Sequence, residues 1–335
     1  MQKTIFVVDD SLSNLSLAEE ALENNYRVIT LSSADKMYAT LEKVIPDLIL
    51  LDIAMPDESG FDAMKKLKAN SNHAEIPVIF LTALTDTFNE ALGIELGAVD
   101  FITKPFSEPV LLNRVKNHIQ IDKIIKERTA QLVSLKNSIV STMSSIVENR
   151  DNNTQGHIER TTIHLKTLLE SMLKLGVYAN EIEAWDFDTF ASAACLHDVG
   201  KMRIPSSILN KPGSLTSAEF DIVKTHTIEG EKIINQMIKQ TGEAEYLHTA
   251  KLVALYHHEH WDGSGYPYGL KGDEIPLPGR IMAVIDVFDA LVSERPFRKA
   301  MTYENAVDII NKESGKQFDP KIIAAFNKVS NSFRL

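Results

Sequence analysis

The chain has 335 residues, of which 44% are hydrophobic and 24% are charged, and its formal net charge is −11. This composition is typical of globular proteins, and the length is sufficient for two domains with separate cores. The excess of negative charge opposes non-specific binding to nucleic-acid polymers and to anionic membranes. The single Cys195 excludes an intramolecular disulfide, and no apolar run approaches the roughly 20 residues that span a bilayer, so we expect a cytoplasmic protein.

Short apolar runs at 5–8, 48–51, 78–81 and 101–102 are separated by helix-length amphipathic segments, a pattern that predicts a parallel βαβ sheet. Polar residues follow the ends of these runs, where parallel sheets gather their functional groups. They are Asp9, Asp10, Asp52, Thr82 and Lys104. Any one aspartate here could be a helix cap or a turn residue. Three converging carboxylates instead predict a Mg²⁺ site, with a lysine opposite them that binds a phosphoryl oxygen.

The motifs VVDD, LLDIAMPDESG, FLTA and FITKPF resemble those of response-regulator receiver domains, in the same order, between about Thr4 and His118. The resemblance implies a doubly wound, five-stranded parallel α/β domain over 1–118, with Mg²⁺ bound and a sensor histidine kinase as partner. It makes Asp52 the phospho-acceptor and Lys104–Pro105 a cis peptide. The other residues that it assigns are Asp9 and Asp10 for Mg²⁺, Thr82 and Lys104 for the phosphoryl group, and Phe101 as the switch aromatic.

Residues 119–150 predict a continuous helix, because apolar residues recur at alternating steps of four and three without Pro or Gly. The positions of this seam are Ile121, Ile125, Arg128, Leu132, Leu135, Ile139, Thr142 and Ile146. Such a seam favours pairing with a second copy in a homodimer, although Arg128 and Thr142 weaken it. The alternative is an amphipathic helix packed on its own domain. A continuous helix could also carry a rotation or a register change between the two domains.

Eight of the ten histidines lie between His157 and His260. Apolar spacings of three and four in 158–175, 187–196, 220–238 and 250–256 predict an all-α bundle, which could bring distant side chains together. The predicted metal ligands are His157, His197, Asp198, His226, His257, His258 and Asp286. This donor set suits two octahedral transition metals that share a bridging carboxylate such as Asp198, with Fe or Mn favoured and Zn or Ni possible. His164, His248 and His260 are expected to be ordinary core or surface histidines.

The stretches DNNTQGHIER, CLHDVGKMRIPSSILNKPG, KTHTIEG, YHHEHWDGSGYPYGLKGDEIPLPGRI and DVFDALVSERPFRKAM resemble HD-GYP phosphodiesterases of the HD hydrolase superfamily. The resemblance implies an HD-type bundle over 151–335 that hydrolyses cyclic di-GMP to linear pGpG or GMP, under control of Asp52 phosphorylation. It assigns His157, His197, Asp198 and Asp286 to one metal and Asp198, His226, His257 and His258 to the other. It makes Asp198 and Lys201 catalytic, and the substrate contacts that it implies are Lys201, Gly265, Tyr266, Pro267, Arg295 and Arg298.

One position departs from the family pattern. Members with three metals carry a glutamate four residues before the first ligand histidine, where this chain has Asn153, so we expect two metals. Asp289, one helical turn beyond Asp286, is expected to support a ligand through a hydrogen bond. Two alternatives remain: a scaffold that binds a cyclic dinucleotide without turnover, and an HD hydrolase acting on another cyclic dinucleotide or phosphoester. The complete ligand set and Lys201 favour turnover.

Overall fold

The computed structural model describes residues 2–82, 92–150, 156–242, 244–294 and 299–334. The chain divides into two compact units, Met1–Leu132 and Val133–Leu335, and the division lies inside the predicted connector. Within the described ranges, no helix is both long enough and apolar enough to cross a membrane.

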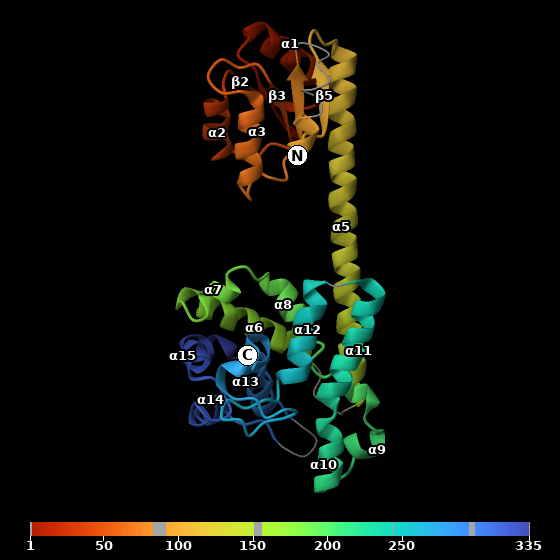
Figure 1. Cartoon of the computed structure of the whole chain (residues 1–335), viewed down its shortest axis with the longest axis vertical. Coiled ribbons are helices and arrows are strands. Elements are labelled where there is room, and N and C mark those ends of the chain that lie inside the picture. Colours follow the sequence, from red (N-terminus) through yellow and green to blue (C-terminus); the bar gives the residue numbers. More distant parts are fainter. Residues whose placement is uncertain (1, 83–91, 151–155, 243, 295–298, 335) are drawn as a thin grey trace. The chain divides into compact units, whose positions relative to one another are not determined.

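The first unit, coloured red to yellow in Figure 1, is built on a five-stranded parallel sheet with the strand order β2-β1-β3-β4-β5. The strands are β1 (Thr4–Val8), β2 (Arg27–Leu31), β3 (Leu48–Asp52), β4 (Val78–Thr82) and β5 (Asp100–Thr103). The register pairs Asp52 with Leu81 and Thr82 with Thr103, so the polar residues that end these strands meet at one edge of the sheet. The predicted sheet is confirmed.

The central strands of this sheet are buried on both sides, because helices cover both faces. The helices of this unit are α1 (Leu12–Leu22), α2 (Ala34–Leu41), α3 (Gly60–Ala69) and the start of α5 (Glu108–Arg150). Ile5 and Val7 of β1 share a core with α1 and α5, whereas Phe6 and Val8 share a core with α2 and α3. This arrangement is doubly wound, as predicted, and it leaves the carboxyl edge of the strands as the place for a site.

Helix α5 runs without interruption from Glu108 to Arg150, which confirms the predicted continuous helix. Leu111 and Val115 are buried in the first unit, and Val140 and Val147 in the second. The six apolar residues of the seam are each exposed by half or more: Ile121, Ile125, Leu132, Leu135, Ile139 and Ile146. They therefore lie on a face of α5 that neither core covers.

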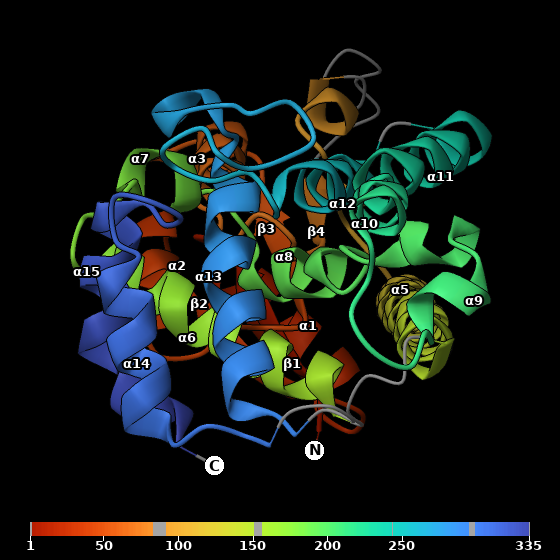
Figure 2. The same cartoon turned by 90° about the horizontal axis from the view of Figure 1, so that it is seen from below.

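The second unit is a helical bundle, as predicted. Its elements are the end of α5, α6 (His157–Lys174), α7 (Ala179–Ile182), α8 (Phe187–Ala194), η1 (Val199–Arg203), α9 (Ser206–Leu209), α10 (Ser217–Lys224), α11 (His226–Thr241), α12 (Glu245–Tyr256), η2 (Gly272–Glu274), α13 (Leu277–Val292), α14 (Tyr303–Lys312), α15 (Pro320–Val329) and η3 (Ser330–Phe333). Helix α13 is buried on most of its surface and lies between α12 on one side and α14 and α15 on the other (Figure 2).

The helical stretch predicted over 220–238 is divided into two helices by Thr225. Both the amide and the hydroxyl of Thr225 donate to the carbonyl of Ile222, at 3.1 and 2.6 Å, which tightens the chain into a turn. Helix α10 therefore ends at Lys224 and α11 begins at His226. The apolar spacing alone did not indicate this break, which places His226 at the start of a helix.

Candidate functional site

The carboxyl edge of the sheet in the first unit gathers the three predicted carboxylates. Asp9, Asp10 and Asp52 each offer an oxygen, and these oxygens lie within 4.8 Å of one another. Such a cluster of hard oxygen ligands fits Mg²⁺. Lys104 faces it, with Nζ 2.6 Å from Asp9 Oδ2 and 2.8 Å from Asp52 Oδ1. Burial raises the pKa of Asp52, although the neighbouring Lys104 acts in the opposite direction.

The remaining predicted residues of this unit lie close to that edge. Thr82 is buried and follows Leu81, the register partner of Asp52. The ring of Phe101 packs against Phe80, with 5.6 Å between the centroids. The predicted cis peptide between Lys104 and Pro105 is confirmed.

The second unit holds two groups of predicted ligands whose donor atoms lie within 4.8 Å of one another in each group. One group is His226, His257 and His258, and the other is His157, His197 and Asp286. Asp198 lies between the groups, with Oδ2 3.4 Å from His197 Nε2 and Oδ1 3.4 Å from His226 Nε2. Each of its carboxylate oxygens faces a different group, which is the geometry required to bridge two cations.

Helix ends position these side chains. His157 and His226 are the first residues of α6 and α11, and His257 directly follows α12. Asp286 projects from the buried helix α13. Gly200 allows η1 to approach α11 closely, because a Cβ at this position would overlap the carbonyl oxygen of His226. This close approach brings Asp198 to the group formed by His226, His257 and His258.

Hydrogen bonds at Nδ1 orient four of the histidines. The acceptors are the carbonyls of Ala194, Val223 and Val253 for His197, His226 and His257, at 2.9, 2.7 and 3.0 Å, and Asp289 Oδ2 for His157, at 2.7 Å. Donation from Nδ1 leaves the lone pair of Nε2 available to a metal. Asp289 is itself held by Arg160, whose Nε lies 2.7 Å from Oδ1. Asp289 therefore makes the predicted supporting hydrogen bond.

The electrostatics of the cluster fit divalent metal ions. Burial lowers the pKa of His257 to about 3 and that of His258 well below its ordinary value, so both imidazoles are neutral at pH 7. Burial acts on His197 in the same direction, but the carboxylates of Asp198 and Asp286 outweigh it and raise the pKa to about 9. Two buried atoms of the cluster, His197 Nε2 and Asp198 Oδ1, have no hydrogen-bond partner within the described part of the chain. Imidazole and carboxylate donors without thiolate suit Fe, Mn, Zn or Ni.

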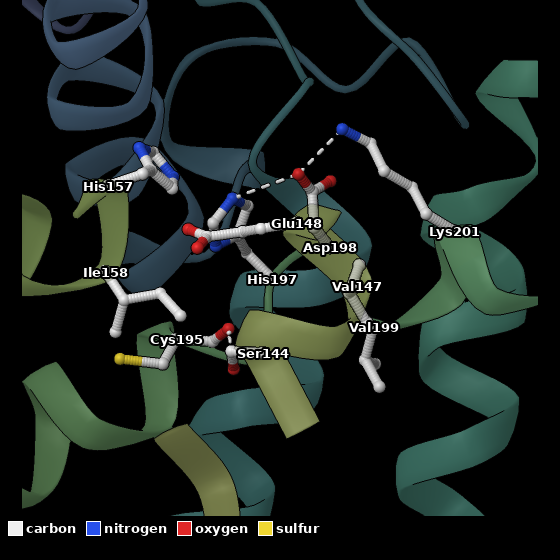
Figure 3. A pocket seen from close by; sticks show the side chains of 10 residues that line it. All are labelled: Ser144, Val147, Glu148, His157, Ile158, Cys195, His197, Asp198, Val199 and Lys201. Carbon is white, nitrogen blue, oxygen red and sulfur yellow. Dashed lines mark hydrogen bonds and ion pairs between the residues drawn. The ribbon is translucent and has the colours of Figure 1, made fainter. Parts of the chain in front are cut away.

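Lys201 lies at the edge of this cluster, with Nζ 2.8 Å from Asp198 Oδ2 (Figure 3). Although burial favours protonation of Asp198, Lys201 and His197 hold the pKa of this carboxyl well below its ordinary value. A phosphate that reached the cluster would therefore meet a lysine and an ionised carboxylate side by side.

The predicted substrate contacts Gly265, Tyr266 and Pro267 lie in a loop beside the group formed by His226, His257 and His258. The ring of Tyr266 stacks on His258, with 4.7 Å between the centroids, and Tyr266–Pro267 is a cis peptide. At Gly265 a Cβ would overlap the backbone nitrogen of His260, so the close turn requires glycine.

Glu259 holds this loop, a role that the sequence analysis did not identify. Its buried carboxylate accepts hydrogen bonds from the backbone amides of Tyr268 and Leu270, at 2.8 and 3.0 Å. The acidic residue directly after the pair His257 and His258 was the available signal, but acidic residues are common in loops.

Glu148 is a second residue that the sequence analysis missed. It lies in the last turn of α5 and lines a small cavity of about 10 Å³ together with His157, His197, Asp198 and Lys201 (Figure 3). Its position on α5 was predicted, but its neighbours come from segments far along the chain.

The sequence analysis named further residues of the second unit that lie in neither group of ligands or outside the described ranges. Arg295, Arg298 and Asn153 lie outside the described residues. His164, His248 and His260 belong to none of the potential metal-binding groups found among the described residues. His164 is buried, His248 is exposed, and His260 Nδ1 lies 2.9 Å from Ser264 Oγ.

Comparison with known proteins identifies both units. A family model described as an HD domain matches residues 129–322, and one described as a response regulator receiver domain matches residues 5–116. The chain is 38% identical to a probable cyclic di-GMP phosphodiesterase of Vibrio cholerae, over 97% of this chain and 77% of the relative. It is 31% identical to the cyclic di-GMP phosphodiesterase response regulator RpfG of Xanthomonas campestris, over 96% of this chain and 86% of the relative.

A further relative carries a different substrate in its name. The 3'3'-cGAMP-specific phosphodiesterase 2 of Vibrio cholerae is 37% identical over 55% of this chain and 33% of the relative.

Proposed function

This chain belongs to the HD-domain family and carries a response-regulator receiver domain, and we propose that it is a response regulator that hydrolyses cyclic di-GMP to linear pGpG or GMP. The observation that carries the proposal is Asp198, whose two oxygens face two separate groups of metal ligands. The relatives named as cyclic di-GMP phosphodiesterases, which align along nearly the whole chain, support the choice of substrate.

The proposed metal centre holds two divalent ions, with Fe or Mn favoured over Zn or Ni. His157, His197, Asp198 and Asp286 would hold one ion, and Asp198, His226, His257 and His258 the other. Such ions would lower the pKa of an attacking water and offset charge on the phosphoryl oxygens. Ligation requires His197 to lose the proton that its neighbouring carboxylates favour, so metal binding is expected to release protons.

The chain's own side chains would bind and orient the substrate. Lys201 Nζ, beside Asp198, would contact the scissile phosphate and stabilise charge that develops in the transition state. Tyr266, stacked on His258, offers an aromatic face and a hydroxyl at the rim of the cluster, with Gly265 and Pro267 fixing the loop. Arg295 and Arg298 are proposed as further substrate contacts on the strength of the sequence resemblance alone.

In the first unit we propose that Asp52 accepts a phosphoryl group from a sensor histidine kinase, with Mg²⁺ held by Asp9, Asp10 and Asp52. Lys104 lies 2.8 Å from Asp52 Oδ1, where it could contact a phosphoryl oxygen. Thr82 and Phe101 are proposed as the residues that respond to phosphorylation. The proposed domains are 1–118, the connector 119–150, and 151–335.

The exposed seam of α5 supports a homodimer. Six apolar side chains at heptad spacing, each exposed by half or more, cover a face of α5 that neither core uses. A second copy of the same helix would bury these side chains in a parallel coiled coil.

The test is turnover of cyclic di-GMP by anaerobically purified protein loaded with Fe²⁺ or Mn²⁺, with the products separated by chromatography. Asp198→Asn is expected to abolish product formation, because it removes the charge of the proposed bridge between the two ions. Asp188→Asn is the matched control, since Asp188 lies on the surface of the same unit, with 79% of its side chain exposed. It should retain wild-type turnover.

Cyclic GMP-AMP belongs in the same assay as a competing substrate, because one relative is named for it. Preferential cleavage of cyclic GMP-AMP would reassign the substrate while keeping the reaction. Tight binding of cyclic di-GMP without cleavage under every metal would favour a scaffold and contradict the proposed enzyme.

A further inference from the structure

The last turns of α5 are fixed to the segment that carries the proposed metal ligands. Ser144 Oγ donates to the carbonyl of Cys195 at 2.7 Å, and Arg150 Nη1 donates to the carbonyl of Met202 at 2.8 Å. The carbonyls that accept these bonds flank His197, Asp198 and Lys201 along the chain. Glu148 lies between Ser144 and Arg150 on α5, so its backbone is held from both sides.

The carboxylate of Glu148 points toward the rings of His157 and His197 (Figure 3). One of its oxygens, Oε1, is buried and has no hydrogen-bond partner among the residues that the structure describes. Burial raises the pKa of Glu148, whereas His157 and His197 act in the opposite direction. The cavity is about the size of one water molecule. A carboxylate oxygen buried there without a hydrogen bond raises the free energy of the folded state unless a cation or a donor satisfies it.

We propose that Glu148 is a fifth protein ligand of the ion assigned to His157, His197, Asp198 and Asp286. This inference rests on the proposed metal centre and extends it to the end of α5. Four protein atoms leave two positions of an octahedral ion unfilled. The carboxylate of Glu148 faces the ion's imidazole ligands from the cavity and can fill one of these positions, which leaves the other for water or substrate.

The test is titration calorimetry of Mn²⁺ into the metal-free protein. Excess Mg²⁺ in the buffer occupies the sites that are made of hard oxygen ligands. Glu148→Gln removes the charge of the ligand, and Glu148→Asp keeps the charge but shortens the reach by one methylene. Both variants are expected to bind one of the two ions about 10- to 100-fold more weakly. Glu159→Gln is the control, because it removes the same charge from an exposed residue two positions from His157. It should bind both ions as the wild type does.

Far-UV circular dichroism of each metal-free variant would establish that the fold is retained. If Glu148→Asp bound Mn²⁺ like the wild type while Glu148→Gln bound it weakly, the carboxylate would act only through its charge, and the ligand role would be wrong. Unchanged binding by both variants would also overturn it. A wild-type chain that bound no Mn²⁺ under these conditions would instead overturn the metal centre itself, and the role of Glu148 with it.

Discussion

Histidines of the second unit differ in what their Nδ1 atoms contact. His257 donates from Nδ1 to the carbonyl of Val253, so its Nε2 faces the cluster. His164 is equally buried, but its ring packs against Phe288 and Phe333, and its Nδ1 has no hydrogen-bond partner in the ranges that the structure describes. The contacts of each ring, and not the residue type, therefore separate the proposed ligands from a histidine of the core.

The burial of His164 predicts a pH-dependent stability. Burial lowers the pKa of His164 to about 4, from 6.5. Below pH 6.5 the unfolded chain takes up a proton that the folded chain does not, so stability is lost as the pH falls toward about 4. His164→Leu should reduce this loss by up to about 1.4 kcal/mol per pH unit. The free energy of unfolding in urea, measured on metal-free protein between pH 7 and pH 4.5, gives the two slopes.

His248→Leu is the control for this measurement, because His248 is exposed. Its pH slope should equal that of the wild type. Parallel slopes for His164→Leu and the wild type would show that His164 takes up its proton without cost in the folded state, contrary to the expectation.

The predicted ligands were accessible from sequence because two adjacent pairs, His197-Asp198 and His257-His258, stand out among helical segments. Glu148 and Arg160 were missed because they lack such a local signal. Each is an ordinary charged residue in a helix, and its role depends on a contact with a segment distant in sequence, such as that between Arg160 and Asp289. Local patterns carry no information about such contacts.

At the scale of elements, the apolar runs identified the strands except for β2. This strand lies at the edge of the sheet, and four of its five residues are at least partly exposed. A search for apolar runs finds strands that are buried on both faces and misses a mixed edge strand such as Arg27–Leu31. Only the family resemblance predicted five strands.

Helix α5 leads to a prediction about association. Ile125→Lys combined with Leu132→Lys places two charges on the exposed seam, where these residues are 58% and 67% exposed. Because like charges would face each other across the proposed coiled coil, the double variant should be monomeric at concentrations where the wild type is dimeric. Sedimentation velocity measures both states.

Thr129→Lys combined with Ser134→Lys is the matched control, since both residues are exposed and lie off the seam. This variant should remain dimeric. A wild-type chain that sedimented as a monomer would contradict the proposed dimer and leave the seam as an unpaired face.

At the scale of the whole molecule, two polar sites lie in two different units, and one helix belongs to both units. The proposed phospho-acceptor lies in the unit where α5 begins. Glu148, in the last turn of α5, lines the cavity beside the proposed metal ligands. A change in the first unit that shifted α5 would therefore act directly on the proposed metal centre.

Asp52→Asn tests whether the two sites are coupled. Beryllofluoride, a mimic of the phosphoryl group, should change the rate of cyclic di-GMP hydrolysis by the wild type. It should leave the rate of Asp52→Asn unchanged, because the variant lacks the acceptor carboxylate. Without beryllofluoride, the variant and the wild type should have the same basal rate. Chromatographic rate measurements with and without beryllofluoride provide the comparison. Identical rates for the wild type under both conditions would argue against control through Asp52.

The unbroken course of α5 has a geometric consequence for evolution and for engineering. Each residue added to an α-helix lengthens it by about 1.5 Å and turns everything beyond it by about 100°. Seven added residues nearly complete two turns and miss by only about 20°. Connectors that differ by whole heptads therefore keep nearly the same rotation about the helix axis. A difference of one or two residues changes this rotation by about 100° or 200°.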